Sequence, residues 1–290
     1  MLLAIIREIR VYQWVKNLLI FVPLLLSHSY SNLELIIQST IAFFAFCLCA
    51  SSVYVINDLC DIEADRDHPT KKNRPIAAGL ISRFSAKILA VVLFTTALLI
   101  AYYLNKDFLF IFLSYFTLTL AYSFGLKALA IIDVLILGGL YTLRVIAGVV
   151  VINVEISFWL IVFSLFVFFS LALLKRYIEL KNLLGRNKKT AGGRGYAVDD
   201  LNLLLIMGVI SSFIATLVVA LYIHDPAVAT IYSNPIWLWM VLPAMLFWLS
   251  RIWLMANRGE LNEDPVLFAL SDGVSYLVVV VCMTSVVLAV

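Results

Sequence analysis

Residues 36–56 read IIQSTIAFFAFCLCASSVYVI, a run without a single charged side chain. A helix of about 20 mostly apolar residues is long enough to cross the hydrocarbon core of a bilayer. The sequence NDLCDIEAD follows directly at residues 57–65 and carries four acidic residues. The pattern predicts a membrane helix that ends in polar chemistry at one boundary of the bilayer.

The rest of the 290-residue chain has the same apolar character. Hydrophobic residues make up 63% of it, charged residues 13%, and the mean hydropathy is +1.03. Soluble domains usually carry about 25% charged residues, so the composition excludes an ordinary soluble domain. We expect an all-α fold, a polytopic membrane bundle of nine transmembrane helices in a single domain over 1–290, arranged as two four-helix halves plus a ninth helix. The expected spans are roughly 15–29, 36–56, 84–104, 107–124, 129–151, 156–175, 201–223, 236–256 and 268–289.

Lysine and arginine residues are distributed unevenly around these spans. Nineteen of the 21 lie at the N-terminus or in connections on one side of the bundle, whereas Lys106 lies on the other side. Because cytoplasmic loops carry the excess of Lys and Arg, we expect an inner (plasma) membrane protein with a cytoplasmic N-terminus and an outer C-terminus. Arg144 falls inside the fifth span; it is either a substrate-binding residue or bonds carbonyl groups within the bundle.

Three acids after the second span are spaced to share one helical face. Asp58, Asp61 and Asp65 stand at i, i+3 and i+7. Carboxylates placed together repel one another, and a divalent cation removes that repulsion. Oxygen ligands suit Mg²⁺, which proteins usually hold with carboxylates and substrate phosphates. The predicted cofactor is therefore Mg²⁺, and Asn57 stands four residues before Asp61.

A basic segment, residues 66–79, comes next. Its His68, Lys71 and Arg74 are suited to phosphate oxygens, which arginine grips as a fork and lysine meets as a point charge. Acids, a metal and then a basic cluster together predict a diphosphate site on the cytoplasmic side. The alternative is a solvated loop that merely obeys the positive-inside rule, but such a loop does not need its acids on one stripe.

A second polar motif stands where the sixth span ends, in SLALLKRYIEL at residues 170–180. Lys175 and Glu179 are spaced i, i+4, so the acid is expected to orient the lysine. The basic, glycine-rich loop at 185–200 follows and could close over an anionic ligand, or it could be only a flexible cytoplasmic loop. The candidate substrate-binding residues of this region are Lys175, Arg176, Tyr177, Glu179, Arg194 and Tyr196.

Other polar residues carry weaker signals. Lys16, at the entry of the first span, and Lys127, after the fourth, are either cavity-lining residues or interfacial anchors. The charges of residues 251–272, among them Asp264, are expected to be structural. The four cysteines have no metal spacing, and neither a nucleotide fingerprint nor a nucleophile elbow is present. No nucleic-acid partner is expected, and the sequence leaves a homo-oligomer open.

The motifs NDxxDxxxD, at 57–65, and HPxKxxRPIAAG, at 68–79, resemble the UbiA prenyltransferase superfamily. The segments QWVKN, YSFGLK, DVLILGGLYTLRVIAG and LKRYIEL extend that resemblance over most of the chain. It implies a nine-span intramembrane enzyme that uses Mg²⁺-bound diphosphates. Typical members carry a second aspartate-rich motif after the sixth helix, where this sequence has Lys175, Arg176, Tyr177 and Glu179 instead.

That departure resembles the branch typified by decaprenyl-phosphate phosphoribosyltransferases, enzymes of cell envelope biosynthesis. The resemblance implies transfer of 5-phosphoribose from phosphoribosyl diphosphate to a polyprenyl phosphate lipid. It implies that Asp58, Asp61 and Asp65, with Asn57, hold Mg²⁺-diphosphate, and that these three acids and Lys175 are the catalytic residues. Two other functions stay open: a prenyltransferase acting on an aromatic or quinone precursor, and a transporter. A transporter would place ionisable groups near the midplane and not at the boundary. The resemblance implies phosphate contacts from Lys71, Arg74, Lys175 and Arg194, which Tyr177 and Tyr196 orient.

Overall fold

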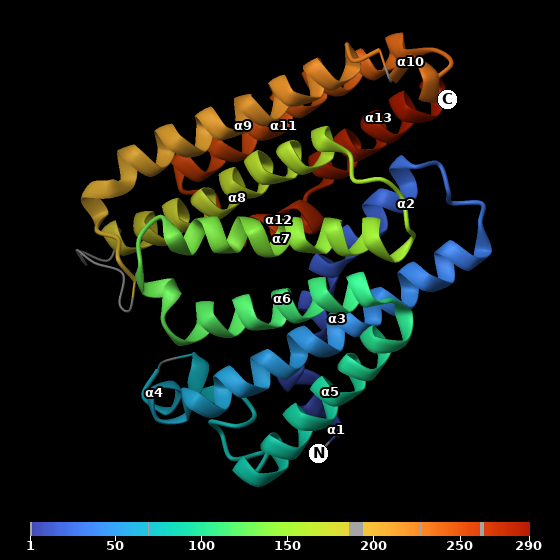
Figure 1. The fold of residues 1–290 in the computed structure, drawn as a ribbon. Helices are drawn as coiled ribbons and strands as arrows, with labels where there is room; N and C mark the ends of the chain where they lie inside the picture. Colours follow the sequence, from blue (N-terminus) through green and yellow to red (C-terminus); the bar gives the residue numbers. More distant parts are fainter. Residues whose placement is uncertain (1, 69, 186–193, 227, 262–263) are drawn as a thin grey trace. The chain divides into compact units, whose positions relative to one another are not determined.

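The structure, a computed structural model, describes residues 2–68, 70–185, 194–226, 228–261 and 264–290 (Figure 1). Every regular element of this part of the chain is a helix, as expected. The chain divides into two compact units: a first unit of residues 1–124 and 143–156, and a second unit of residues 125–142 and 157–290. One of the boundaries, between residues 142 and 143, lies within a helix, α7 (Ile132–Val151), and the other two lie in the connections before and after that helix.

The first unit is built around α3, which packs against α5 and runs beside it in Figure 1. Asn32 caps α3 by accepting the backbone N–H groups of Glu34 and Leu35, and Ser82 caps α5 in the same way. Small buried side chains on one face of α5 allow the two helices to approach closely. These are Ala86, Ala90, Ala97 and Ala101. The elements are α1 (Leu2–Glu8), η1 (Val11–Phe21), α2 (Val22–Leu26), α3 (Leu33–Cys60), α4 (Ile62–Arg66), η2 (Lys71–Asn73), α5 (Arg83–Leu104) and α6 (Lys106–Phe124).

The second unit is organised by α8, which packs against α9. Ser170 of α8 donates a hydrogen bond to the carbonyl of Gly208 in α9, at 2.7 Å. A Cβ atom on Gly208 would lie 2.1 Å from the Trp253 ring of α11, so only glycine permits this packing. The elements are η3 (Leu126–Ala128), α8 (Phe158–Leu184), η4 (Val198–Asp200), α9 (Leu201–Ile223), α10 (Val228–Ile231), η5 (Pro235–Met240), α11 (Val241–Arg258), α12 (Pro265–Ser271) and α13 (Gly273–Ala289).

The prediction of nine spans is not confirmed. Seven helices of the described residues are long and apolar enough to cross a membrane, and an eighth span forms if α12 and α13, bent by 84°, count as one. The first expected span corresponds to a shorter apolar helix, Val11–Leu26. Eleven of its residues have 3₁₀ winding, which rises about 2.0 Å per residue instead of 1.5 Å. The segment therefore extends roughly 30 Å, the thickness of the hydrocarbon core, and stays a candidate for the ninth span.

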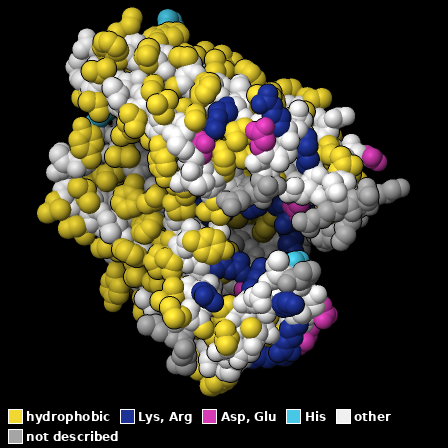
Figure 2. All heavy atoms as spheres, turned by 180° about the vertical axis from the view of Figure 1, so that it is seen from behind, with side chains coloured by type: hydrophobic (Ala, Val, Ile, Leu, Met, Phe, Trp, Pro, Cys, Tyr) yellow, Lys and Arg dark blue, Asp and Glu magenta, His cyan; other side chains and the backbone are white. Residues whose placement is uncertain are grey.

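The surface has the character of a protein surrounded by lipid. Hydrophobic side chains cover much of the face seen in Figure 2. On α5 alone, Phe84, Val91 and Leu99 are each more than half exposed. Soluble proteins rarely expose contiguous apolar surface on this scale, so the chain is an integral membrane protein.

A reporter fused after Val290 tests the number of crossings. If Val11–Leu26 crosses the bilayer together with the other eight spans, the two termini lie on opposite sides, and we expect Val290 outside. Alkaline phosphatase fused there should be active, and green fluorescent protein should be dark. Strong fluorescence with inactive phosphatase would mean that Val11–Leu26 does not cross.

Candidate functional site

Asp58, in the last turn of α3, is the centre of the first cluster of charges. Its side chain is 3% exposed. Arg10 Nη2 lies 2.6 Å from each of its two carboxylate oxygens, and Arg74 Nη1 lies 3.0 Å from Oδ1. A carboxylate buried to this extent needs such partners, because an unpaired buried charge is strongly destabilising.

Asp65 joins the same cluster, but the helical face expected for the acids does not form. The helix α3 ends at Cys60, and Asp61 is an exposed residue at the break before α4. The nitrogen Nη1 of Arg74 lies 2.6 Å from Asp65 Oδ2 and also contacts Asp58, so it is the arginine that joins the two acids. Asp61 therefore stands apart from the cluster, contrary to the i, i+3, i+7 prediction.

Arg10 reaches Asp58 through an unusual backbone conformation. It has φ 51° and ψ 53°, the left-handed region, which costs a side-chain-bearing residue roughly 1–2 kcal/mol. Its guanidinium also lies 4.8 Å from the centre of the Tyr54 ring. Burial lowers the pKa of Arg10, but the Asp58 carboxylate outweighs burial and raises it above its ordinary value. The ion pair with Asp58 thus stabilises the strained turn between α1 and η1.

Glu8, the last residue of α1, is a site residue that the sequence analysis missed. It is 1% exposed, and neither of its carboxylate oxygens makes a hydrogen bond of good geometry with a described residue. The backbone of Ile76 and the Asp58 carboxyl group are among its polar neighbours. Burial and then the neighbouring Asp58 carboxylate raise the pKa of Glu8 to about 7. The sequence does contain a feature that could identify it, because Glu8 is the one acidic residue among the first 33 residues.

The cluster has the composition of a cation site. Three carboxylates, from Glu8, Asp58 and Asp65, face two guanidinium groups, and the Glu8 oxygens make no hydrogen bond of good geometry with a described residue. As they stand, no three acidic, histidine or cysteine side chains of the described residues converge on one point. Arg74 stands between Asp58 and Asp65. Mg²⁺ usually takes only one or two carboxylates together with substrate phosphates and water, so these residues fit that ion.

The other residues predicted around the first motif lie outside this cluster. The amide nitrogen of Asn57 donates to Ser123 Oγ at 3.0 Å. His68 Nδ1 accepts from the backbone N–H of Lys71 at 3.3 Å, which closes the loop before η2, and the Lys71 side chain is exposed. Asn57 is therefore held by α6, and the two basic residues remain on the surface.

A second cluster, in the second unit, joins the start of α7 to the end of α8. Arg176, 1% exposed, places Nε 2.5 Å from Asp133 Oδ2 and Nη1 2.7 Å from Glu179 Oε2. Arg194 lies 3.1 Å from the same Glu179 oxygen, and Tyr196 donates to Asp133 Oδ1 at 2.5 Å. Burial and this contact raise the pKa of Tyr196, which therefore keeps its proton. Two carboxylates face two guanidinium groups, so this cluster is balanced. Sequence reasoning did not assign Asp133 to it.

Lys175 pairs with a different acid from the one expected. Its Nζ lies 2.8 Å from Asp264 Oδ2, at the start of α12, and the acid expected to orient it, Glu179, is taken by Arg176 and Arg194. Asp264, expected to be only structural, is thus the partner of a predicted site residue. The hydroxyl of Tyr177, which is buried, donates to Asn257 at 2.8 Å. Residues 186–193 of the glycine-rich loop lie outside the described part of the chain.

Arg144 is bound within the first unit. Its Nε donates to Asn17 Oδ1 and its Nη2 to the Tyr115 hydroxyl, both at 2.8 Å. Its guanidinium also lies 4.8 Å from the centre of the Tyr115 ring. These contacts join η1, α6 and α7 inside the bundle. Lys16 in η1 and Lys127 in η3 are both half-buried.

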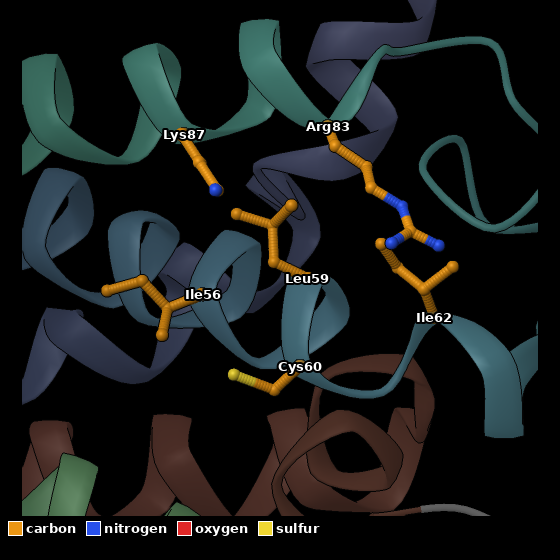
Figure 3. A pocket seen from close by; sticks show the side chains of 6 residues that line it. All are labelled: Ile56, Leu59, Cys60, Ile62, Arg83 and Lys87. Atoms are coloured by element: carbon orange, nitrogen blue, oxygen red, sulfur yellow. The ribbon is translucent and has the colours of Figure 1, made fainter.

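A hollow of about 380 Å³ lies between the end of α3 and the start of α5 (Figure 3). No predicted site residue lines it. Its lining combines apolar side chains with two cations, whose long stems can lie along apolar surface while the charges stay in water. The lining residues are Ile56, Leu59, Cys60, Ile62, Arg83 and Lys87.

Comparison with known proteins identifies the family. Residues 18–273 match the family model described as the UbiA prenyltransferase family. The chain belongs to the UbiA prenyltransferase family. Both clusters lie within the matched range apart from Glu8 and Arg10, which precede it. The N-terminal contribution to the first cluster is therefore a feature outside the matched part of the chain.

Curated relatives of this UbiA family member include three kinds of protein. It is 41% identical to the uncharacterized protein y4nM of Sinorhizobium fredii, over 93% of this chain but only 53% of that protein. It is 31% identical to the nodulation protein NoeC of Azorhizobium caulinodans, over 92% of this chain and 86% of that protein. The decaprenyl-phosphate phosphoribosyltransferase of Mycolicibacterium smegmatis is 39% identical over 61% of this chain and 57% of that protein.

Solved structures support the same fold. A UbiA homologue from Archaeoglobus fulgidus, bound to GPP and Mg²⁺, superposes with a TM-score of 0.70 at 16% identity, over 98% of this chain and 99% of that chain. A digeranylgeranylglyceryl phosphate synthase superposes with a TM-score of 0.69 at 17% identity, over 99% and 98% of the two chains. At such identities the likeness establishes the architecture of the UbiA fold alone.

The buried pair of Arg176 and Asp133 predicts a large effect on stability. Asp133→Asn should lower the free energy of unfolding by about 3 kcal/mol, the low end for a broken buried pair, because Glu179 still faces Arg176. The apparent melting temperature of the detergent-solubilised protein should fall by several degrees. Glu63→Gln is the matched control, since Glu63 is 72% exposed and its pairs should contribute at most about 1 kcal/mol. Equal shifts in melting temperature for the two variants would show that the pair of Arg176 and Asp133 does not contribute to stability.

Proposed function

We propose that this protein is a Mg²⁺-dependent membrane glycosyltransferase. It moves 5-phosphoribose from phosphoribosyl diphosphate to a polyprenyl phosphate, at the cytoplasmic face of the inner membrane. The acidic cluster around Asp58 binds Mg²⁺-diphosphate, and the cationic groups at the end of α8 bind further phosphate oxygens.

The observation that carries this proposal is the difference in charge between the two clusters. The first has three carboxylates against two guanidinium groups, and the Glu8 oxygens make no hydrogen bond of good geometry with a described residue. In the second, both carboxylates are already paired with arginine. Lys175 and Arg194 keep 38% and 26% of their side chains exposed there. One site with an excess of carboxylates and one balanced site with two partly exposed cations suit a reaction that brings together a diphosphate, a sugar phosphate and a lipid phosphate.

The relatives support the same reaction class. The similarity to decaprenyl-phosphate phosphoribosyltransferase covers 61% of this chain at 39% identity, well above the 16% identity to the homologue bound to GPP. That similarity names the donor sugar and the acceptor class of the proposal. The relative of highest identity described above carries no functional name, and this chain spans about half of its length.

The proposed chemistry is a displacement at the anomeric carbon of the donor. An oxygen of the lipid phosphate forms the new bond to C1, and the bond from C1 to the diphosphate breaks, with the electron pair leaving on the diphosphate. The lipid phosphate is already ionised, so no protein base is required. The transition state has oxocarbenium character, as in other glycosyl transfers. Mg²⁺ neutralises charge on the departing diphosphate when it is bound.

The residues of this chain supply position and electrostatic stabilisation. Asp58 and Asp65 would hold the metal, and Arg10 and Arg74 would then be available to pair with diphosphate oxygens. Lys175 is held by Asp264 in reach of solvent and is available to a phosphate.

The remaining site residues keep lesser roles in the proposal. Asn57 and Asp61 remain proposed metal ligands that would have to rotate toward the cluster. The other proposed substrate-binding residues are Lys16, His68, Lys71, Lys127, Arg144, Arg176, Tyr177, Glu179, Arg194 and Tyr196.

A second candidate function is prenyl transfer to an aromatic or quinone-precursor acceptor. Membership of the UbiA prenyltransferase family favours it directly. A prenyltransferase of this family typically carries a second acidic motif, and here the acids at the end of α8 are paired with arginines. Product analysis separates the two functions.

The first test is an assay of purified protein with Mg²⁺ and two donor–acceptor pairs. With phosphoribosyl diphosphate and decaprenyl phosphate, we expect a phosphoribosyl lipid and released diphosphate. With a prenyl diphosphate and an aromatic acid, we expect no transfer. Asp58→Asn and Asp65→Asn should abolish the first reaction, whereas Glu34→Gln, an exposed acid at the opposite end of α3, should not. Prenyl transfer without phosphoribosyl transfer would contradict the proposal.

The second test concerns Lys175. A charge-assisted hydrogen bond contributes about 1.5–3 kcal/mol, so Lys175→Ala should slow phosphoribosyl transfer roughly 10- to 150-fold. The Mg²⁺ requirement should not change, because the lysine acts on phosphate. Lys87→Ala, which removes a cation from the hollow beside α5, is the matched control and should retain activity. If Lys175→Asp keeps full activity, the end of α8 is not a phosphate site.

A further inference from the structure

Glu8 is buried in an environment where an ionised carboxylate without a positively charged partner is energetically unfavourable. It is 1% exposed, and neither of its oxygens makes a hydrogen bond of good geometry with a described residue. Its polar neighbours include the backbone of Ile76 and the Asp58 carboxyl group. Its charged neighbours are the Asp58 carboxylate, which repels it, and Arg10, which is already committed to both Asp58 oxygens. Buried charges are normally paired or coordinate a metal.

The chain is folded so that Glu8 and Asp58 face each other. Glu8 ends α1, and the left-handed conformation of Arg10 two residues later turns the chain. That turn places the Arg10 guanidinium on the carboxylate of Asp58, 48 residues further along. A strained backbone is retained where the surrounding contacts enforce it, and such residues concentrate at functional sites.

We propose that Glu8 and Asp58 together bind the divalent cation, so that the N-terminal helix α1 supplies a metal ligand to the acidic cluster. The inference rests on the proposed cation site at Asp58 and adds a residue outside the range matched by the UbiA family model. Glu8 would join Asp58 and Asp65 as a ligand, and phosphate oxygens and water would complete the octahedral shell of Mg²⁺. A cation between Glu8 and Asp58 would remove the repulsion between the two buried carboxylates.

Binding of Mn²⁺ alone tests the proposal without substrate or turnover. Binding is measured as the loss of the paramagnetic signal of free Mn²⁺. The wild-type protein should bind Mn²⁺, and Glu8→Gln, which keeps the shape and removes the charge, should weaken binding at least tenfold. Glu8→Asp should retain part of the affinity. Glu63→Gln, an exposed acid in α4, is the matched control and should bind like the wild type. Added Mg²⁺ should raise the melting temperature of the wild type and not that of Glu8→Gln.

Three results would overturn the inference. A Glu8→Gln variant that binds Mn²⁺ like the wild type, while Asp58→Asn does not, would leave the cation site in place without Glu8. Unchanged binding in both variants would contradict the cation site itself. A wild-type protein that binds no Mn²⁺ at millimolar concentrations would likewise contradict the pairing of Glu8 with Asp58.

Discussion

The contact between Asp58 and the two arginines Arg10 and Arg74 is the interaction on which the polar end of α3 depends. Asp58 ends an apolar helix, so its charge is buried and must be balanced nearby. Arg10 brings α1 and η1 to the end of α3, and Arg74 brings the loop after α4 to the same point. One buried carboxylate thus joins three separate segments of the chain.

The same contact accounts for the proposed chemistry. A cation bound by these carboxylates would release Arg10 and Arg74, whose guanidinium groups are well suited to diphosphate oxygens. The second cluster differs because its carboxylates and guanidinium groups are equal in number. The account therefore assigns metal to the first cluster and phosphate alone to the second.

Much of the architecture could be predicted from the sequence, because an apolar run of span length is a local property. The helices α3, α5 and α9 lie close to their expected ranges. The segment Val11–Leu26 was harder to predict as a span. Its 3₁₀ winding changes the rise per residue and thus the number of residues needed to cross the bilayer. The helix break at Asp61 was missed because periodicity assumes a continuous helix.

The pairing of charges could not be predicted, since it joins residues distant in the sequence. Lys175 and Asp264 are 89 positions apart, and a spacing argument favoured Glu179 only because it is near. Glu8 was missed for a similar reason: its importance comes from its burial beside Asp58, which depends on the turn at Arg10.

The most direct test of the central claim is a structure determined with Mn²⁺ and phosphoribosyl diphosphate bound. The account predicts anomalous density for Mn²⁺ beside the carboxylate oxygens of Asp58, with Arg74 moved from Asp58 and Asp65 onto the diphosphate. It would be contradicted if Asp58 remained bound to both Arg10 and Arg74 while the metal and the diphosphate were held elsewhere in the protein.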